Sequence, residues 1–427
     1  MIRILTGALT VPEIRKKLGI TLFLLALYRI GAQIPVPGVS RAGVEELQNA
    51  EQFQAGALQL LNVFSGGALS QIAIFALGIM PFITASIVLQ LLQVVVPALE
   101  KLKQEGEIGQ QRITQYTRYL TVFLALGQSF AYVTLFRSIE TGGPDLIENF
   151  NIAKLVLIAA SLTGGAMIVM WLGELITQRG VGNGMSLMIF ASIVSGLPGG
   201  ISAWWNSGDP VFKVLLPVII LAVISAVVFV QEGQRRIPIQ YAKRVIGRRM
   251  SGGGQTYLPL KVNMANVIPV IFAASILSIP PTIAQVISGS QDNAIQNALL
   301  PGTWGYIAAE SVFILLFTYF YTAVTFNPVE QADNLKKYGG FIPGVRPGRP
   351  TAEFLDRVLA RLTFPGAIYL ALVAAIPTIL FSKAFGSATQ GFAFGGTSIL
   401  IVVGVALDTV KQLEAQLMMR NYEGFLK

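Results

Sequence analysis

The sequence predicts an all-α polytopic membrane protein with ten transmembrane helices. Of its 427 residues, 53% are hydrophobic and only 12% are charged, and the mean hydropathy is +0.63. A soluble domain carries about 25% charged residues. Ten apolar runs are also long enough to cross a bilayer as helices, which takes about 20 residues. We therefore expect the chain to fold in lipid.

The ten apolar runs follow one another along the whole chain. They are centred on residues 18–36, 72–96, 117–136, 153–176, 184–202, 212–231, 264–287, 305–326, 362–382 and 396–414. The first follows the basic residues 15–17, as the apolar part of a signal peptide would. Because no Ala-x-Ala-like site follows it and nine further runs do, we interpret it as a retained first span.

The lysines and arginines predict the orientation. With the N-terminus in the cytoplasm, 25 of the 31 basic residues fall in cytoplasmic segments, most of them in the loops 232–263 and 328–361. This asymmetry fits the positive-inside rule. We expect both termini to be cytoplasmic.

Ten spans also divide into two sets of five, in residues 1–205 and 206–427. An odd number per set makes the second set run through the membrane opposite to the first, and such inverted halves enclose a central pathway in many transporters. The alternative is that any ten-span chain divides in this way.

A short apolar segment, "QLLNVFSGGALSQ" at 59–71, lies directly before the second run. It is too short to span a bilayer and too apolar for an exposed loop. Gly66 and Gly67 each weaken a helix by about 1 kcal/mol relative to alanine. We expect a re-entrant half-helix that enters from the extracytoplasmic side, where irregular backbone is tolerated if protein encloses it. The alternative is an interfacial helix on the outer surface.

The composition excludes several kinds of chemistry. The chain has no cysteine and no histidine, which removes disulfides, thiolate or imidazole metal sites, and Ser–His or Cys–His catalysis. No Gly-Lys dipeptide is present, so a Walker-type phosphate loop is absent. We expect no enzymatic activity and no cofactor, and any nucleotide hydrolysis that drives the protein would occur elsewhere.

Two long basic loops interrupt the apolar pattern. In the first, strand-like residues on both sides of "SGGG" (251–254) predict a basic β-hairpin. The second contains four prolines, and we expect its tip to present Arg346 and Arg349. These loops could simply orient the chain. The pair Arg248 and Arg249 could also contact RNA phosphates, with an affinity that falls as salt rises.

Four charged residues lie within or at the edges of apolar runs: Arg29, Glu174, Glu310 and Asp408. An unpaired charge at mid-bilayer costs several kcal/mol. We expect structural pairing or anchoring of these residues, with proton relay as the alternative.

Several stretches resemble one family closely. They are "YRIGAQIPVPG" (28–38), "FALGIMPFITASIVLQLL" (75–92), "VVPALEKLKQEGEIGQ" (95–110), "WLGELITQRGVGNGMSL" (171–187), "LPLKVNMANVIPVIFA" (258–273), "FNPVEQADNLKKYGGFIPGVRPGRPT" (326–351), "GGTSILIVVGVALD" and "QLMMRNYEGFLK". The family is SecY, the channel subunit of the bacterial protein-secretion translocon. The resemblance implies a channel in the inner (plasma) membrane that translocates unfolded secretory polypeptides and releases apolar segments into lipid, driven by a bound ribosome or ATPase motor.

The resemblance also implies a pore ring. Spacing alone shows only that Ile79 and Ile83, and Met185 and Ile189, are i,i+4 neighbours, which occur in every membrane helix. The family's ring positions fall on Ile79, Ile83, Met185, Ile189, Ile271 and Ile401. Methionine at 185 departs from the usual isoleucine but remains apolar and adaptable. An apolar constriction resists water and hydrated ions, since it offers them no hydrogen bonds.

Further sites follow from the resemblance. A plug would comprise Leu61, Asn62, Val63, Phe64, Ser65, Gly66, Gly67, Ala68, Leu69 and Ser70. A lateral gate between spans 2 and 7 would contain Thr84 and Ile279, and Arg248, Arg249 and Arg346 would bind partners. The implied partners are the SecE and SecG membrane subunits, the SecA ATPase, the ribosome through its RNA backbone, signal sequences, nascent polypeptides and membrane lipid.

Two other classes of protein remain as alternatives. A secondary transporter for a small solute would also suit inverted halves, but it should place polar or charged ligands at mid-membrane, where this chain has isoleucine and methionine. An intramembrane enzyme would need Ser–Lys or aspartate-pair chemistry, and no two aspartates fall at mid-span positions.

Overall fold

The structure is a computed structural model. It describes residues 11–49, 57–138, 146–147, 150–206, 210–241, 244–246, 249–251, 255–288, 298–299, 302–384 and 395–425. The helices of the first half of the chain are α2 (Pro12–Gly31), α3 (Arg41–Asn49), α5 (Ala57–Phe64), α6 (Met80–Val95), α7 (Pro97–Gln104), α8 (Glu107–Ser138), α9 (Ile152–Arg179), α10 (Gly184–Ser195) and α11 (Leu197–Asn206). Those of the second half are α12 (Pro210–Glu232), α13 (Ile268–Ser288), α15 (Trp304–Thr325), α16 (Pro328–Lys337), α17 (Arg349–Ala384) and α18 (Gly396–Phe425).

Each of the ten predicted spans coincides with at least one helix, but the count of ten is not confirmed by length and composition. Within the described residues, six helical segments are long and apolar enough to cross a membrane, or up to seven if α6 and α7, which are bent by 97° at a break between them, form one span. The helix α2 carries several basic residues, and the apolar part of α13 is short. These helices therefore match the length and hydropathy of a membrane span less clearly than the other six do.

Several span boundaries differ from the prediction. The second run was expected from residue 72, but residues 65–79 form turns and α6 begins only at Met80. Two hydrogen bonds tie these turns to the chain after α2: Val36 N donates to Ile72 O at 3.0 Å, and Ile74 N donates to Ile34 O at 2.9 Å. The apolar residues before Met80 are therefore buried as turns, since tertiary contacts satisfy their backbone without a helix.

The two predicted loops form one small domain. Strand β1 (Gln234–Tyr241) pairs antiparallel with β4 (Gln255–Lys261), as the hairpin prediction requires, and β2 (Arg244–Ile246) pairs with β3 (Arg249–Ser251). The second loop contributes β5 (Gly340–Phe341), which pairs with the other edge of β1. A side chain at Gly340 would lie 3.0 Å from the ring of Tyr241, so glycine permits this approach. The sequence did not predict that the loops share a sheet.

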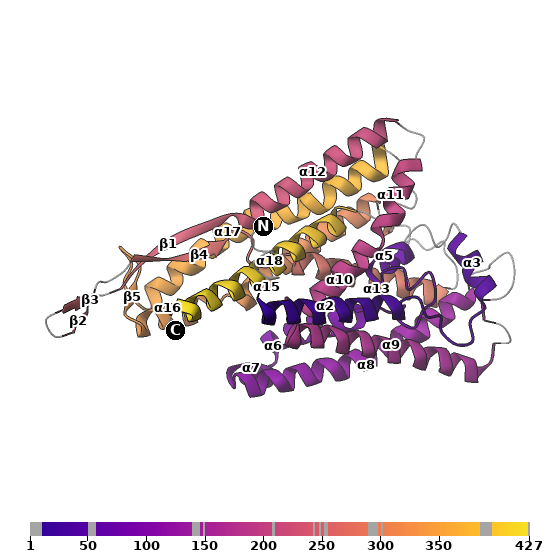
Figure 1. Cartoon of the computed structure of the whole chain (residues 1–427), viewed down its shortest axis with the longest axis horizontal. Coiled ribbons are helices and arrows are strands. Elements are labelled where there is room, and N and C mark those ends of the chain that lie inside the picture. Colours follow the sequence, from indigo (N-terminus) through magenta and orange to yellow (C-terminus); the bar gives the residue numbers. More distant parts are fainter. Residues whose placement is uncertain are drawn as a thin grey trace.

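This sheet packs on helix α17. Ile237 and Leu260 of the sheet share an apolar cluster with Leu355 and Leu359 of α17. Helix α17 begins at Arg349, well before the apolar run predicted from residue 362, and so extends beyond the bundle to support the sheet (Figure 1). We call this end of the molecule the sheet end.

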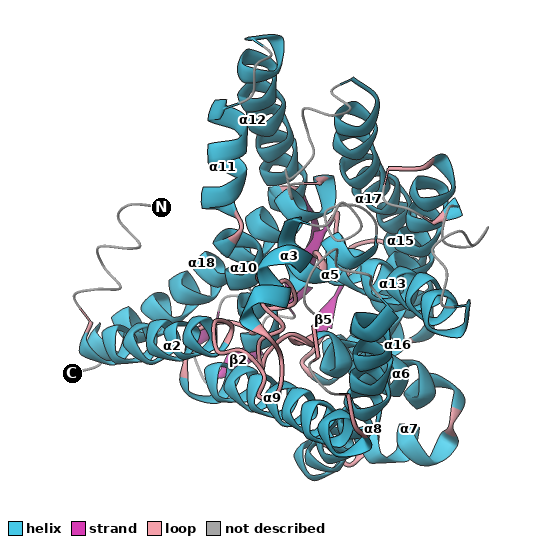
Figure 2. Ribbon diagram, turned by 90° about the vertical axis from the view of Figure 1, so that its right-hand side faces the viewer, coloured by secondary structure: helices cyan, strands magenta, loops and turns pink. Residues whose placement is uncertain are grey.

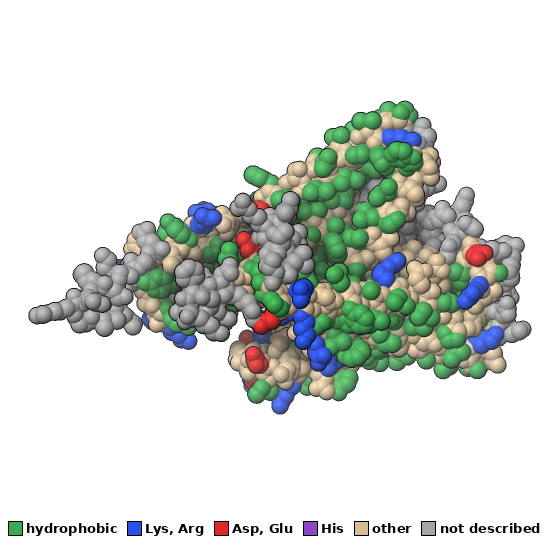
Figure 3. Space-filling view, viewed as in Figure 1, with side chains coloured by type: hydrophobic (Ala, Val, Ile, Leu, Met, Phe, Trp, Pro, Cys, Tyr) green, Lys and Arg blue, Asp and Glu red, His purple; other side chains and the backbone are tan. Residues whose placement is uncertain are grey.

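The helices form one bundle with α5 near its centre (Figure 2). Helix α5 contacts α10 and α13, while α6 contacts α13 and α10 contacts α18. Hydrophobic side chains form a broad band over the flanks of the bundle, and charged side chains lie mostly on either side of this band (Figure 3). On α12, Val214 and Phe229 are 71% and 81% exposed. Such extensive apolar exposure is typical of a surface in contact with lipid.

Candidate functional site

The six residues expected to form a ring lie in one apolar cluster. Ile79, Ile83, Ile189, Ile271 and Ile401 are buried, and the partly buried Met185 packs against them. They come from four places: the start of α6, the first part of α10, the start of α13 and the start of α18. Since α6 contacts α13, α13 contacts α18 and α18 contacts α10, these four helices form one continuous series.

Gly173 of α9 lies close to both Met185 of α10 and Ile79 at the start of α6. A methyl group on Gly173 would lie 2.8 Å from Sδ of Met185 and 3.6 Å from Cδ1 of Ile79. The absence of a side chain at position 173 therefore gives the longer methionine room beside Ile79.

The segment expected to be a plug lies inside the bundle. Leu61, Phe64, Ala68 and Leu69 are all buried in the same cluster as the ring residues. This burial disfavours a helix on the outer surface. Only residues 57–64 are helical, so the helix is shorter than the segment 59–71 that we expected.

The two glycines end the helix, which corrects our expectation that they weaken its middle. Gly67 N donates to Asn62 O at 2.9 Å and Gly66 N donates to Val63 O at 3.1 Å, the pattern of a Schellman motif. The φ angles are +68° at Gly66 and +84° at Gly67, which glycine adopts at little cost. Asn62 also accepts from Ser70 N through its Oδ1 at 2.9 Å. Glycines at 66 and 67 thus fold the following chain back on the helix.

Side chains of α2 and α10 hold the end of α5. Tyr28 Oη donates to Ser65 O at 3.1 Å and lies 2.6 Å from Ser192 Oγ. Arg29 Nη1 donates to Gly66 O at 2.7 Å, and Ser195 Oγ is 3.3 Å from the same oxygen. Helix C-termini leave carbonyl groups without intrahelical partners and carry partial negative charge, so a cation there is favourable. A hydrogen bond to a charged group contributes about 1.5–3 kcal/mol.

Sequence reasoning found only part of this arrangement. Arg29 was singled out for its charge, and its partner is a carbonyl group of the plug segment. Tyr28, Ser192 and Ser195 were missed, although the two serines are i,i+3 neighbours and so share one face of α10. Nothing in their local sequence indicates a partner more than 100 residues away.

The two predicted gate residues line one cavity. Thr84 of α6 and Ile279 of α13 face a space of about 430 Å³ whose remaining wall comes from α8 and from Leu61 of α5. Thr84 Oγ1 donates to Met80 O at 3.0 Å within its own helix. The contact between the helices includes Ser275 Oγ, which lies 3.7 Å from Sδ of Met80. The seam between α6 and α13 is thus apolar, with few polar links.

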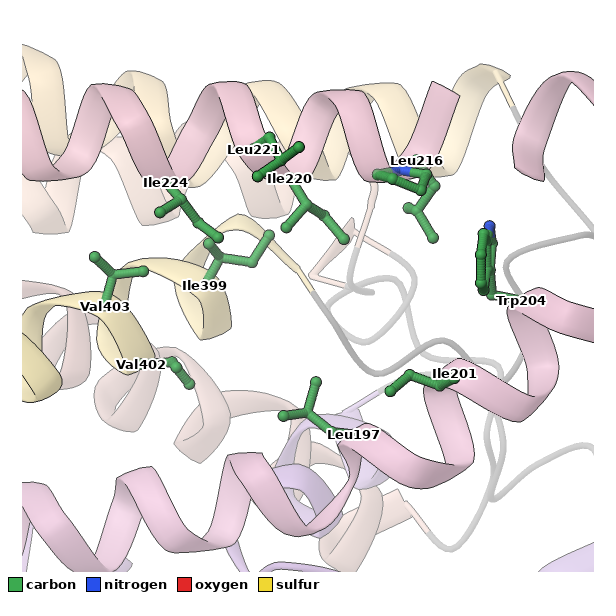
Figure 4. Close-up of a pocket in the computed structure, with 11 residues that line it drawn as sticks. Leu197, Ile201, Trp204, Leu216, Ile220, Leu221, Ile224, Ile399, Val402 and Val403 are labelled. Carbon is green, nitrogen blue, oxygen red and sulfur yellow. The ribbon is translucent and has the colours of Figure 1, made fainter. Parts of the chain in front are cut away.

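A second apolar cavity, of about 410 Å³, lies between α11, α12 and α18 (Figure 4). Leu197, Ile220 and Ile399 are among the side chains that line it, and none of the predicted site residues does.

The predicted partner-binding arginines are only partly described. Arg346 is exposed between β5 and α17, and its carbonyl oxygen accepts from Thr351 Oγ1 at 2.8 Å. Arg249 begins β3, and Arg248 lies outside the described residues. Arg349 was expected at the loop tip but is the first residue of α17, where it pairs with Glu353 at 3.3 Å.

The other three charged residues in apolar runs lie beside polar or charged groups of the protein. Glu174 accepts two hydrogen bonds from Arg118, as the pairing prediction requires. Glu310 is 2% exposed and accepts from Tyr306 Oη at 3.4 Å. Asp408 lines a small pocket of about 170 Å³ whose walls are both polar and apolar. Among the described residues, no group of acidic side chains is arranged to hold a metal ion.

Comparisons with known proteins agree with this architecture. The family model SecY matches residues 73–410. The chain is 52% identical to the protein translocase subunit SecY of Corynebacterium glutamicum, covering 97% of this chain and 98% of that protein. It is 48% identical to the protein of the same name from Mycobacterium bovis over the full length of both.

Solved structures show the same fold at lower identity. A protein-conducting channel matches with a TM-score of 0.68 at 19% identity, covering 94% of this chain and 92% of that one. Sec61 in a canine ribosome–channel complex matches with a TM-score of 0.65 at 18% identity, with the same coverage. With a family model that spans most of the chain and relatives close to half identical, the chain belongs to the SecY family.

Proposed function

We propose that this chain is a protein-conducting channel that translocates unfolded secretory polypeptides and releases apolar segments sideways into the bilayer. The observation that carries the proposal is that the five isoleucines of the expected ring are buried in one apolar cluster together with Leu61, Phe64, Ala68 and Leu69 of the segment 61–70. The names of the close relatives, protein translocase subunits, support it. A secondary transporter would need a set of polar ligands at this centre, where Ile79, Ile189 and Ile271 are buried.

In this proposal the ring is a seal. Isoleucine and methionine side chains offer no hydrogen bonds to replace those that water or a hydrated ion would lose, so the closed ring excludes both. The plug, residues 61–70, adds a second barrier when it occupies the space beside the ring. A polypeptide in transit displaces the plug and fills the constriction itself.

The lateral gate is the seam between α6 and α13. The cavity beside Thr84 and Ile279 provides apolar volume at this seam, of a size that suits large apolar side chains. An apolar segment of a passing chain would enter the cavity and then move between the helices into lipid. The driving force is burial of its apolar surface, about 25 cal/mol per Å².

The membrane arrangement is also a proposal. Ten spans form two inverted halves, residues 1–205 and 206–427. The protein lies in the inner (plasma) membrane, and both termini and the sheet end face the cytoplasm. The excess of basic residues in the loops 232–263 and 328–361 supports this orientation. Labelling of a cysteine at position 251 only from the extracytoplasmic side would contradict it.

The partners follow from the sheet end and from the family. We propose that Arg248, Arg249 and Arg346 dock the ribosome or the SecA motor, and that SecE and SecG accompany the chain in the membrane. The exposed position of Arg346 and the ribosome-bound state of the Sec61 relative support this. Signal sequences and nascent polypeptides are the substrates, and any RNA contact is with phosphates.

Reconstitution tests the function directly. Vesicles that contain this chain with its co-purifying membrane subunits, supplied with a SecA-type ATPase and ATP, should protect an unfolded secretory precursor from external protease. Vesicles without the chain should not. Absence of protection together with uptake of a small solute would favour the transporter alternative.

A further inference from the structure

We propose that Tyr28, Arg29, Ser192 and Ser195 form a binding site for main-chain carbonyl groups, which the plug occupies at rest and an extended polypeptide in transit occupies after the plug has left. We call these four residues the carbonyl site. The inference rests on the proposed channel function and assigns a ligand class to residues beside the ring.

The first observation is that the site binds backbone alone. Its two ligands in this structure are Ser65 O, which accepts from Tyr28 Oη, and Gly66 O, which accepts from Arg29 Nη1. Neither bond involves a side chain of the plug. Every residue of every polypeptide carries the same carbonyl group, so the site can bind any sequence.

Two hydroxyl protons must be placed at this site. The hydroxyl groups of Tyr28 and Ser192 each have one proton. In the arrangement that serves Ser65 O, Tyr28 donates to it, and Ser192 Oγ, 2.6 Å away, donates to Tyr28 Oη rather than to Met188 O of its own helix, which lies at 2.9 Å. Ser195 Oγ lies closer to Ser192 O, at 2.6 Å, than to Gly66 O, at 3.3 Å, so Arg29 is the main donor to Gly66. Tyr28 and Arg29 are therefore the main binding groups. Ser192 contacts the Tyr28 hydroxyl, and Ser195 adds a longer contact to Gly66 O.

The second observation concerns Arg29. Among the described residues no carboxylate lies within 4.0 Å of its guanidinium group. When the plug leaves, Arg29 loses its carbonyl partner, and Tyr28, which is 1% exposed while the plug is in place, loses one too. Buried donors without acceptors are costly. An extended chain, which presents a carbonyl group on one side at every second residue, about every 6.6 Å, can replace the lost bonds.

The third observation is the position of the site on the pathway. Ser192 and Ser195 follow the ring residue Ile189 on α10 by one and two turns, about 4.5 Å and about 9 Å along the helix axis. Ser192 is an i,i+3 neighbour of Ile189. In the proposed orientation, a chain that has passed the ring meets the carbonyl site next. Exchange of plug carbonyls for substrate carbonyls then makes opening less costly without selecting sequences.

The plug half of the proposal is tested by cysteine labelling in the reconstituted complex. The chain has no cysteine, and Ala68 in the plug is 0% exposed, so Ala68→Cys reacts with a membrane-impermeant maleimide only when the plug moves. Adding Arg29→Gln should raise the labelling rate by about tenfold to a hundredfold, the factor expected for loss of a charged hydrogen bond. Tyr28→Phe, which retains the ring stacked on Phe75, should raise it less, and Arg29→Lys should lie between Arg29→Gln and the parent.

The substrate half is tested in a channel that lacks residues 61–70. There Tyr28→Phe combined with Arg29→Gln should slow motor-driven translocation of an unfolded precursor several-fold, because the donors still serve the chain in transit. The matched control combines Arg41→Gln with Ser161→Ala, an exposed arginine and a half-buried serine that bonds to Leu157 of its own helix. Unchanged translocation would overturn substrate binding, and unchanged labelling of Ala68→Cys would overturn plug binding. A parent complex that translocates nothing would instead refute the proposed function.

Discussion

Arg118 of α8 and Glu174 of α9 form a two-pronged ion pair. Nε donates to Oε1 at 2.9 Å and Nη2 donates to Oε2 at 2.6 Å. The Glu174 side chain is only 11% exposed. This parallel geometry joins two helices of the first half of the chain and gives a buried carboxylate the partner that it needs.

Removing the arginine should therefore destabilise the protein. Arg118→Gln leaves the Glu174 carboxylate without its cation, and we expect a loss of about 1–3 kcal/mol in the free energy of unfolding. Thermal unfolding in detergent measures it. The exposed pair Arg349 and Glu353 provides the control, since Arg349→Gln should change stability by less than about 1 kcal/mol. Equal effects at the two sites would contradict the argument.

Deletion of residues 61–70 should raise resting ion leakage through vesicles that contain the assembled protein. Leu61, Phe64 and Leu69 fill the bundle centre, and only the ring would remain as a barrier. Conductance or dye release provides the measurement, with empty vesicles as the baseline. If the deleted protein assembles and stays as ion-tight as the parent, these residues are not a plug.

The two plug glycines should differ in their response to alanine. Both have positive φ, so both substitutions cost about 1 kcal/mol in backbone strain. A methyl group at Gly66 would also lie 3.0 Å from Nη1 of Arg29 and 3.1 Å from Cα of Ser192, whereas nothing lies within 4 Å of one at Gly67. Gly66→Ala should therefore increase resting leakage more than Gly67→Ala does. The reverse order would show that the contacts with α2 and α10 do not hold the plug.

A disulfide across the seam should lock the lateral gate. Thr84→Cys and Ile279→Cys face one cavity, and they can form a bond only when their Cα atoms come within about 7 Å. We expect oxidation to block membrane insertion of apolar segments and reduction to restore it. Each single cysteine variant is the control. Full insertion activity in the oxidised double variant would show that this seam is not the lateral gate.

Charge reversal at Arg346 should impair motor-driven translocation without unfolding the channel, because the side chain is exposed between β5 and α17. Surface substitutions of this kind usually change stability by less than about 0.5 kcal/mol. Arg41→Glu, exposed near the opposite end of the bundle, is the matched variant and should translocate normally. Equal translocation rates for the two variants and the parent would show that the loop only orients the chain in the membrane.

The sequence by itself determined the class of the protein and most of its elements. Apolar runs of about 20 residues can be read without knowing their neighbours, because lipid forces the backbone to satisfy its own hydrogen bonds in helices. The pairing of β1 with β4 was also predictable, since strand-like residues lie on both sides of the glycine-rich residues 251–254, although the segment between the two strands also contains β2 and β3. The ring and plug residues could be chosen only through resemblance, because isoleucines at i,i+4 are common in any membrane helix.

Only the tertiary structure decided what those residues touch. The carbonyl groups of Ser65 and Gly66 lie against Tyr28, Arg29 and the serines of α10. These contacts depend on the packing of three helices that are distant in sequence. That β5 completes the sheet, and that α17 extends to support it, likewise depends on long-range contacts. Local sequence sets a residue's backbone preference and hydrophobicity, whereas the partner of a polar group is set by whichever distant element packing brings to it.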